Sequence, residues 1–182
     1  MQNEDIKTIL FTEEDIKKRV EELGKEISAD YDGKELILIG LLKGAVYFMT
    51  DLTRRIETKA RIDFMIASSY GAGTVSSGTI NIKRDIETRI KGKHVLVIDD
   101  IIDTGLTLSK ITALLSERGA ASVKTAVLLD KQEHRIGDMK ANYVGFDVPD
   151  EFVVGYGLDF AGFYRTLPYI GILKPAIYAK HE

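Results

Sequence analysis

Apolar residues along the chain follow two patterns, one typical of buried strands and the other of amphipathic helices. The strand-like segments are near-continuous apolar runs at 35–42, 62–68, 94–99 and 123–129. Between them, apolar residues three or four positions apart predict helices through Ile16, Val20, Leu23 and Ile27, through Val46, Met49, Leu52 and Ile56, and through Leu108, Ile111 and Leu115. Thr12 and Asp15 have the spacing of an N-terminal cap for the first helix, and Gly119 is a C-terminal cap for the third.

Strands that alternate with helices imply a parallel sheet with right-handed crossovers. We therefore predict an α/β fold in which a central, mostly parallel, twisted sheet is flanked by helices. The short apolar stretches 143–146, 152–156 and 170–173 are separated by Gly, Pro and Asp, and they predict a small hood on the sheet. Residues 1–182 are expected to form a single domain. The Gly- and Ser-rich segment 68–78 predicts a surface hairpin loop or a lid.

Composition narrows the classes of function. The chain has 182 residues, with 25 Lys and Arg against 28 Asp and Glu, and a formal net charge of −3. It has no Cys, so a disulfide framework and a thiolate metal site are excluded. The acidic balance argues against binding of polymeric nucleic acid, which usually needs a basic surface. No apolar run approaches the roughly 20 residues needed to cross a bilayer. The start of the chain lacks a secretion pattern, so a soluble, cytoplasmic protein is expected.

Acidic residues gather where the strand at 94–99 ends. Asp99 and Asp100 close this strand, Asp103 follows in a short loop, and residues 104–107 open the next helix. Backbone N–H groups at a helix start, with a glycine among them, form a cradle for phosphate. Adjacent carboxylates suit sugar hydroxyls or hydrated Mg²⁺. The same residues also form an ordinary capping turn, but three acids within five positions repel one another and favour a site for a ligand or cation.

This segment, 97–107, resembles the phosphoribosyl-pyrophosphate signature of type I phosphoribosyltransferases. The resemblance covers about residues 10–175, and its C-terminal part is similar to the 6-oxopurine branch, the hypoxanthine-guanine phosphoribosyltransferases. Three further places carry it: Leu41–Gly44 as the pyrophosphate loop, Ser69 and Tyr70 at the head of a flexible lid, and Lys140, 152–159 and Arg165 as the purine-binding portion. The family also has a non-proline cis peptide just before the residue that matches Lys43.

The resemblance implies transfer of ribose 5-phosphate from phosphoribosyl pyrophosphate to hypoxanthine and guanine, with Mg²⁺ as cofactor and release of pyrophosphate. It implies that Asp103 is the general acid or base at purine N7. The 5′-phosphate would be bound by Asp103, Thr104, Gly105, Leu106 and Thr107, and the ribose by Asp99 and Asp100. Pyrophosphate would be bound by Lys43, Gly44, Ser69, Tyr70 and Arg165. The purine would be bound by Lys140, Phe152, Val153 and Asp159, and Mg²⁺ by Asp99, Asp100 and Asp159.

Other functions are compatible with these sequence features. A relative that prefers xanthine or guanine would use the same chemistry and differ only in contacts around 151–159. A nucleotide-sensing RNA-binding regulator on the same fold is a second alternative, although the net charge and the acids of the site count against it. A receiver-type phosphoacceptor is discounted, because its acids follow different strands. The expected partners are small-molecule substrates and further copies of the chain, as a homodimer or homotetramer, with no nucleic acid and no membrane.

Overall fold

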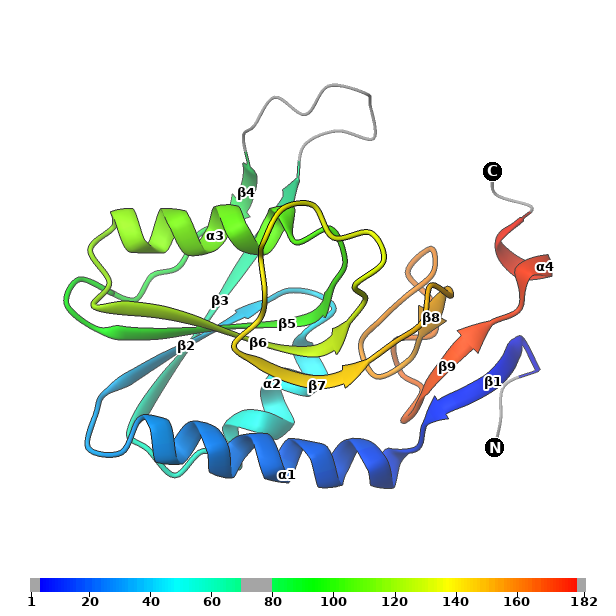
Figure 1. Ribbon diagram of the computed structural model, residues 1–182, viewed down its shortest axis with the longest axis horizontal. Coiled ribbons are helices and arrows are strands. Elements are labelled where there is room, and N and C mark those ends of the chain that lie inside the picture. The colour runs from blue at the N-terminus through cyan, green and yellow to red at the C-terminus, as the bar shows by residue number, and fades with distance from the viewer. Residues whose placement is uncertain (1–3, 70–79, 180–182) are drawn as a thin grey trace.

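A six-stranded sheet forms the centre of the computed structural model, which describes residues 4–69 and 80–179 (Figure 1). The strand order is β4-β3-β2-β5-β6-β7, and only β4 runs antiparallel to its neighbour. The strands are β2 (Leu36–Leu41), β3 (Ala60–Ser69), β4 (Ile80–Arg84), β5 (His94–Ile102), β6 (Ser122–Asp130) and β7 (Tyr143–Asp147). The predicted α/β class with a mostly parallel central sheet is therefore confirmed.

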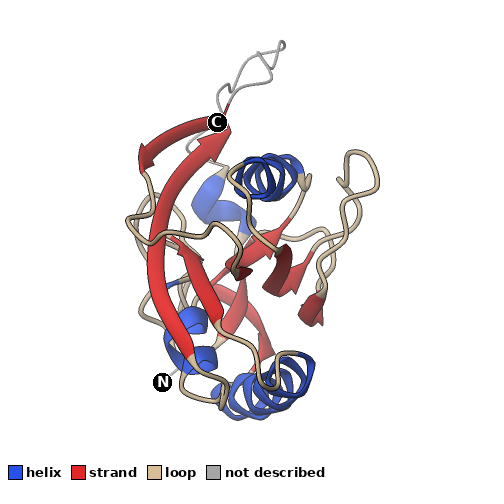
Figure 2. Ribbon diagram, turned by 90° about the vertical axis from the view of Figure 1, so that its left-hand side faces the viewer, coloured by secondary structure: helices blue, strands red, loops and turns tan. Residues whose placement is uncertain are grey.

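Helices cover both faces of this sheet, as the view in Figure 2 shows. The helices α1 (Glu13–Asp30) and α2 (Val46–Thr53) lie on one face, and α3 (Leu106–Glu117) lies on the other. Alternate residues of β2 divide between the two layers. Leu36 and Leu38 belong to the core under α1 and α2, whereas Ile37, Ile39 and Leu41 belong to the core under α3. Because both faces are covered, β2 reads as a continuous apolar run.

A smaller antiparallel sheet forms the predicted hood, but the stretch 143–146, which was expected to belong to it, is part of β7 and pairs with β6 in the central sheet. The smaller sheet has the order β1-β9-β8, with β1 (Ile6–Phe11), β8 (Val153–Val154) and β9 (Ile170–Leu173), and a short helix α4 (Pro175–Tyr178) follows it. The hood has its own apolar core, formed by Ile6, Val154, Tyr169 and Leu173. In Figure 1, β6 and β7 point toward the hood, so the carboxyl ends of these strands face it.

Caps fix the helix ends where the sequence predicts them. The Thr12 hydroxyl accepts the N–H of Asp15 at 3.2 Å, and the Asp15 carboxylate accepts the N–H of Thr12 at 3.0 Å. This reciprocal pair is a capping box, and it lowers the pKa of Asp15. After α3, Gly119 adopts a positive φ of 84°, as a C-terminal cap requires.

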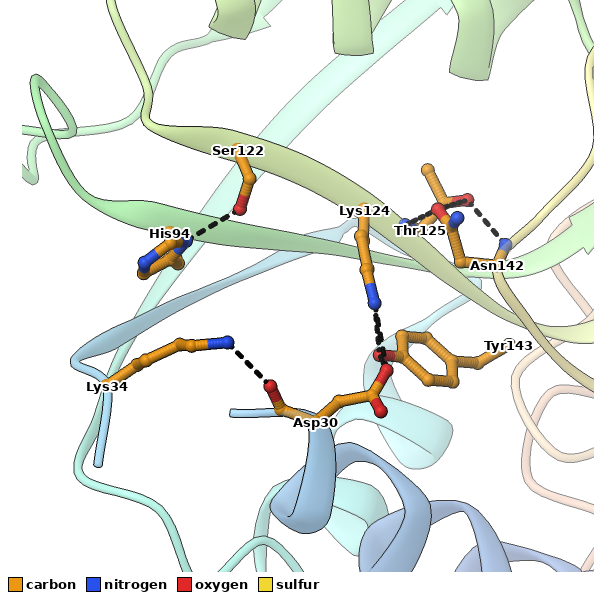
Figure 3. Close-up of polar contacts among 8 residues, drawn as sticks. All are labelled: Asp30, Lys34, His94, Ser122, Lys124, Thr125, Asn142 and Tyr143. Atoms are coloured by element: carbon orange, nitrogen blue, oxygen red, sulfur yellow. Dashed lines mark hydrogen bonds and ion pairs between the residues drawn. The ribbon is translucent and has the colours of Figure 1, made fainter. Parts of the chain in front are cut away.

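The amino ends of the strands are closed by a polar network (Figure 3). Asp30, at the end of α1, accepts hydrogen bonds from Lys124 Nζ at 2.8 Å and from the Tyr143 hydroxyl at 2.6 Å. The bond from Lys124 is the main cause of the lowered pKa of Asp30, and burial raises the pKa of Tyr143. The network ties α1 to β6 and β7 at the edge of the sheet opposite the predicted site.

Several boundaries differ from the prediction. The strand β5 continues to Ile102, beyond the predicted end at Asp99, because β6 offers it partners as far as Asp130. The strand β8 has two residues where five were expected, and α2 ends before Ile56, which packs on the core from the following turn. The strands β1 and β4 were not predicted. Among the described residues, no helix is long and apolar enough to span a membrane.

Candidate active site

The carboxyl ends of β2, β5 and β6 lie at one edge of the central sheet because the three strands run parallel. The chain continues from these ends into residues 42–45, residues 103–105 and Lys131. The segment 151–165 of the hood approaches the same edge. Asp103, at the end of β5, lines a hollow with Phe152, Val153 and Asp159. The structure therefore brings most of the predicted site residues together.

Asp99 and Asp100 are adjacent, half-buried carboxylates near the end of β5. Burial is the largest cause that raises the pKa of Asp99, and the charge of Asp100 raises it further. Burial also raises the pKa of Asp100, although bonding to Asp99 and the charge of Arg165 act in the opposite direction. Such a pair is costly unless a cation or hydroxyl donors reach it.

The loop after β2 packs against Asp100 through backbone atoms. A Cβ added at Gly44 would lie 1.8 Å from Asp100 Oδ2, so only glycine fits there. A Cβ added at Gly157 would in turn lie 2.0 Å from the carbonyl oxygen of Gly44. The peptide between Leu42 and Lys43 is cis, as the resemblance implies. These close approaches fix the position of residues 42–45 relative to the end of β5 and to the hood.

A first hollow of about 150 Å³, here called the loop hollow, lies where α3 begins. Gly105 precedes α3 with a φ of 78° and brings no side chain to the helix start, where the N–H of Leu106 donates to the Thr104 hydroxyl at 3.4 Å. Among the described residues, Asp103 Oδ1 is buried without a hydrogen-bond partner. The loop hollow is lined by Asp99, Ile101, Ile102, Asp103, Thr104, Gly105, Thr107 and Leu108. Its N–H groups and helix start favour an anion such as a phosphate.

A second hollow of about 240 Å³, here called the aromatic hollow, adjoins the first. Phe152 is 38% exposed, and its ring stacks on Tyr178 of α4 at a centroid distance of 5.2 Å, with the edge of Phe160 at 5.4 Å. Neither of these rings lines the hollow, so they support Phe152 from outside it. The aromatic hollow is lined by Asp100, Ile101, Asp103, Lys131, Glu151, Phe152, Val153, Leu158 and Asp159.

Arg165 and Asp159 form an ion pair beside these hollows. Arg165 Nη2 lies 2.5 Å from Asp159 Oδ1, and Arg165 Nη1 donates to the carbonyl oxygen of Gly157. The other carboxylate oxygen of Asp159 accepts the N–H of Gly162 at 2.8 Å. Both predicted residues are therefore at the site, but each is engaged with the other.

Comparisons with known proteins agree with this arrangement. Residues 8–161 match the family model described as a phosphoribosyl transferase domain. The chain belongs to the phosphoribosyltransferase family. It is also 52% identical over 178 residues to a hypoxanthine-guanine phosphoribosyltransferase of Bacillus subtilis (strain 168), and the match covers 98% of this chain and 99% of that protein.

Solved structures of phosphoribosyltransferases have the same fold. A hypoxanthine phosphoribosyltransferase from Staphylococcus aureus is 51% identical with a TM-score of 0.92, over 96% of this chain and 95% of that chain. A hypoxanthine phosphoribosyl transferase of Trypanosoma cruzi is 41% identical with a TM-score of 0.94, over 100% of this chain and 98% of that one. The latter was solved to study the role of its C-terminal region on oligomeric state and enzymatic activity.

Lys140 is the predicted residue that this phosphoribosyltransferase does not bring to the aromatic hollow. It precedes β7 and lines a separate hollow with Arg19 and Asp147, which shares no lining residue with the aromatic hollow. Lys131 lines the aromatic hollow instead. Its amine lies 2.6 Å from Asp150 Oδ1, and its side chain is 15% exposed.

Lys131 could have been found from the sequence, because it directly follows a buried strand, and ligands bind beyond the carboxyl ends of parallel strands.

Two further predictions concern the last residue of β3 and the segment that follows it. Ser69 ends β3, where it pairs with Ile80 of β4. Tyr70, and with it the predicted lid, lies outside the described residues.

Proposed function

We propose that this phosphoribosyltransferase is a purine salvage enzyme that transfers ribose 5-phosphate from phosphoribosyl pyrophosphate to hypoxanthine and guanine. The products are IMP or GMP and pyrophosphate. The bond between C1′ and the pyrophosphate oxygen breaks, and its electron pair leaves with pyrophosphate. A bond forms between C1′ and N9 of the purine, which reacts in its N7–H form, and the proton released from N7 goes to Asp103.

One observation carries this proposal: the loop hollow and the aromatic hollow meet at Asp103 and Ile101, which line both. A phosphate in the first and a flat aromatic ring in the second would be joined by a ribose across this boundary. Asp103 would then be close to the ring plane, and its buried, unpartnered Oδ1 would be available to accept a proton. Phe152 would stack on the ring and Val153 would contact its edge.

The acids of the site fit a hydrated Mg²⁺. Mg²⁺ usually keeps several waters and takes one or two carboxylates together with substrate oxygens. Asp99 and Asp100 supply such a pair, and burial and repulsion leave their charges in need of a cation. The described residues contain no group of three or more His, Cys, Asp or Glu that could hold a metal ion, so Asp159 does not form one with Asp99 and Asp100 in this structure. Bound there, Mg²⁺ would neutralise charge on the leaving pyrophosphate, while Asp99 and Asp100 also bind the ribose hydroxyls. Asp159 remains a further proposed ligand.

We assign the contact with the 6-oxo group to Lys131 rather than Lys140. An ammonium donates hydrogen bonds and accepts none, so it favours a 6-oxo group over the 6-amino group of adenine. Lys131 lies in the same hollow as Phe152, whereas Lys140 lines another. At the opposite end of the substrate, Lys43, Gly44 and Arg165 would bind pyrophosphate.

The test is a steady-state assay with phosphoribosyl pyrophosphate, Mg²⁺ and each of hypoxanthine, guanine, xanthine and adenine. Turnover of hypoxanthine and guanine is expected. Turnover of adenine alone, or of none of the four, would overturn the proposal, and a preference for xanthine would favour the first alternative named above. Asp103→Asn should lower kcat by about 10²-fold or more, because it removes the proton acceptor.

Lys131→Met and Lys140→Met form a matched pair for the purine contact. Loss of one charged hydrogen bond costs about 1.5–3 kcal/mol, so Lys131→Met should raise the KM for hypoxanthine by about 10- to 150-fold. Lys140→Met should leave it unchanged. The opposite result would return the role to Lys140. A cytoplasmic location and a homodimer or homotetramer complete the proposal, and analytical ultracentrifugation would test the oligomeric state.

A further inference from the structure

Arg135 lies behind the loop hollow, in the segment that follows β6. Its guanidinium donates from Nε to the carbonyl oxygen of Asp103 at 2.8 Å, from Nη2 to that of Ile102 at 3.3 Å, and from Nη1 to that of Met139 at 2.6 Å. Nη2 is also paired with the carboxylate of Asp130, which is 7% exposed. One side chain therefore joins the end of β6 to the loop that follows β5.

These bonds set the direction of three consecutive peptide groups. The carbonyl oxygen of Ile102 also accepts the N–H of Lys131 at 2.9 Å, and that of Thr104 accepts the N–H of Ile136 at 2.9 Å. The carbonyls of residues 102, 103 and 104 are thus all held by the segment 131–136. In a trans peptide the next N–H points away from the carbonyl. The N–H groups of residues 103, 104 and 105 are therefore directed away from Arg135, toward the loop hollow.

The stem of Arg135 also packs against the start of α3. A Cβ added at Gly105 would lie 3.0 Å from Arg135 Cδ and 3.1 Å from Met139 Cβ. The loop therefore has no space to relax toward Arg135. The side chain of Arg135 is 13% exposed, and its charge is matched by Asp130. It acts on the loop through hydrogen bonds and packing, without lining the loop hollow itself.

We propose that Arg135 is a positioning residue that holds the peptide groups of 102–104 with their N–H groups toward the 5′-phosphate of the donor. The role of the loop as a phosphate site rests on the proposed function. A lysine cannot replace Arg135, because three carbonyls and a carboxylate need several donors in a planar fork. The expected consequence is selective: binding of the ribose phosphate depends on Arg135, and purine binding does not.

The experiment compares Arg135→Lys with Arg118→Lys in the full chain. Arg118 makes a similar bidentate contact, with Asp85 at 2.7 and 2.6 Å, but at the far end of α3. The probe is ribose 5-phosphate, whose Kd is measured by calorimetry, together with the amide NMR signals of residues 103–107. Arg135→Lys should raise this Kd by about 10-fold or more, as expected when N–H donors lose their alignment. Arg118→Lys should leave it unchanged.

Kinetic constants and chemical rescue by guanidinium distinguish a positioning role of Arg135 from a contribution to overall stability. Arg135→Lys should raise the KM for phosphoribosyl pyrophosphate and lower kcat, with the KM for hypoxanthine unchanged. Added guanidinium should restore part of the activity of Arg135→Ala and none to Arg118→Ala. Should these variants fail to fold, Asp130→Asn offers a milder test, because it keeps Arg135 but removes the charge that holds its guanidinium. This variant should also raise the Kd for ribose 5-phosphate, by a smaller factor.

Unchanged affinity for ribose 5-phosphate in a folded Arg135 or Asp130 variant would overturn the inference, as would equal losses for donor and purine. Failure of the proposed function has a different signature. In that case the wild-type protein turns over no purine, while the effect of Arg135→Lys on ribose 5-phosphate binding is still measured. A drop in melting temperature without a change in Kd would make Arg135 a structural residue only.

Discussion

The contact between Gly157 and Gly44 decides how the hood and the loop after β2 meet, and Gly157→Ala tests it. Gly157 has a φ of 105°, and a Cβ added there would lie 2.0 Å from the carbonyl oxygen of Gly44. Real Cβ atoms essentially never approach closer than 3.0 Å, and the atom in the way is backbone. The two segments must therefore separate by about 1 Å.

This separation acts directly on the active site. The N–H of Gly157 donates to the carbonyl oxygen of Arg165 at 2.9 Å, and Arg165 Nη1 donates back to the carbonyl of Gly157. A shift of Gly157 thus moves Arg165 away from Lys43 and Gly44, which are proposed to bind the same pyrophosphate. Misplacement of reacting groups by about 1 Å costs about 10²-fold in rate. The strained φ adds about 1–3 kcal/mol of lost stability.

The assay measures kcat, the KM for phosphoribosyl pyrophosphate and the melting temperature for Gly157→Ala and for Gly33→Ala. Gly33 also has a positive φ, of 68°, but a Cβ added there meets nothing within 4 Å. Gly33→Ala should therefore lose some stability and keep its kcat/KM. If Gly157→Ala retains the kcat/KM of the wild type, the close approach of these backbones is not needed for catalysis and the reasoning is wrong.

Three further substitutions test other features. Asp63 is buried, and its carboxylate accepts hydrogen bonds from three backbone N–H groups. These bonds lower the pKa of Asp63, although burial acts to raise it. Asp63→Asn should therefore lower the free energy of unfolding by about 2–4 kcal/mol at neutral pH. This loss should shrink as the pH falls through the lowered pKa, which urea denaturation at several pH values measures. Thr12→Ala removes the capping box and should cost about 1 kcal/mol, visible in a thermal melt. Tyr178→Ala removes the ring behind Phe152 and should raise the KM for purine alone, whereas Tyr178→Phe should keep it.

Each of these has a result that contradicts it. A stability difference for Asp63→Asn that does not change with pH would mean that the charge of Asp63 is not what the N–H groups stabilise. Melting of Thr12→Ala at the wild-type temperature would mean that the capping box does not contribute to stability. A rise in the KM for phosphoribosyl pyrophosphate in Tyr178→Ala, equal to that for purine, would assign α4 a general role in the fold.

The central sheet was predictable because its signal is local. The apolar run of β2 and the spacing of Ile16, Val20, Leu23 and Ile27 reflect burial on two faces and on one stripe, and both appear directly in the sequence. The strands β1 and β4 were missed since most of their residues are exposed or half-buried and show no such pattern. Their pairing with β9 and β3 is a tertiary property.

Some residues of the candidate site were also recognisable from the sequence, whereas others join it only through the fold. Asp99, Asp100 and Asp103 stand close together in the sequence, so their clustering could be recognised before any fold was known. Lys131 and Arg135 become part of the site only because β6 ends beside β5. Arg135 was not predicted because it binds backbone carbonyls, and no residue type in the sequence records the direction of a peptide group.

Most cations near the site are already paired with carboxylates, which bears on how a protein of net charge −3 could bind a polyphosphate. Arg135 is paired with Asp130, Arg165 with Asp159 and Lys131 with Asp150, so three positive charges near the two hollows already have carboxylate partners. Arg165 and Lys131 would have to exchange these partners for substrate oxygens, which offsets part of the binding free energy. The negative charge of the proposed donor would then be met first by the N–H groups of residues 103–107, by Lys43 and by Mg²⁺ at Asp99 and Asp100. A site of this kind would favour a small polyphosphate that arrives with its metal over a polyanion that needs free surface cations.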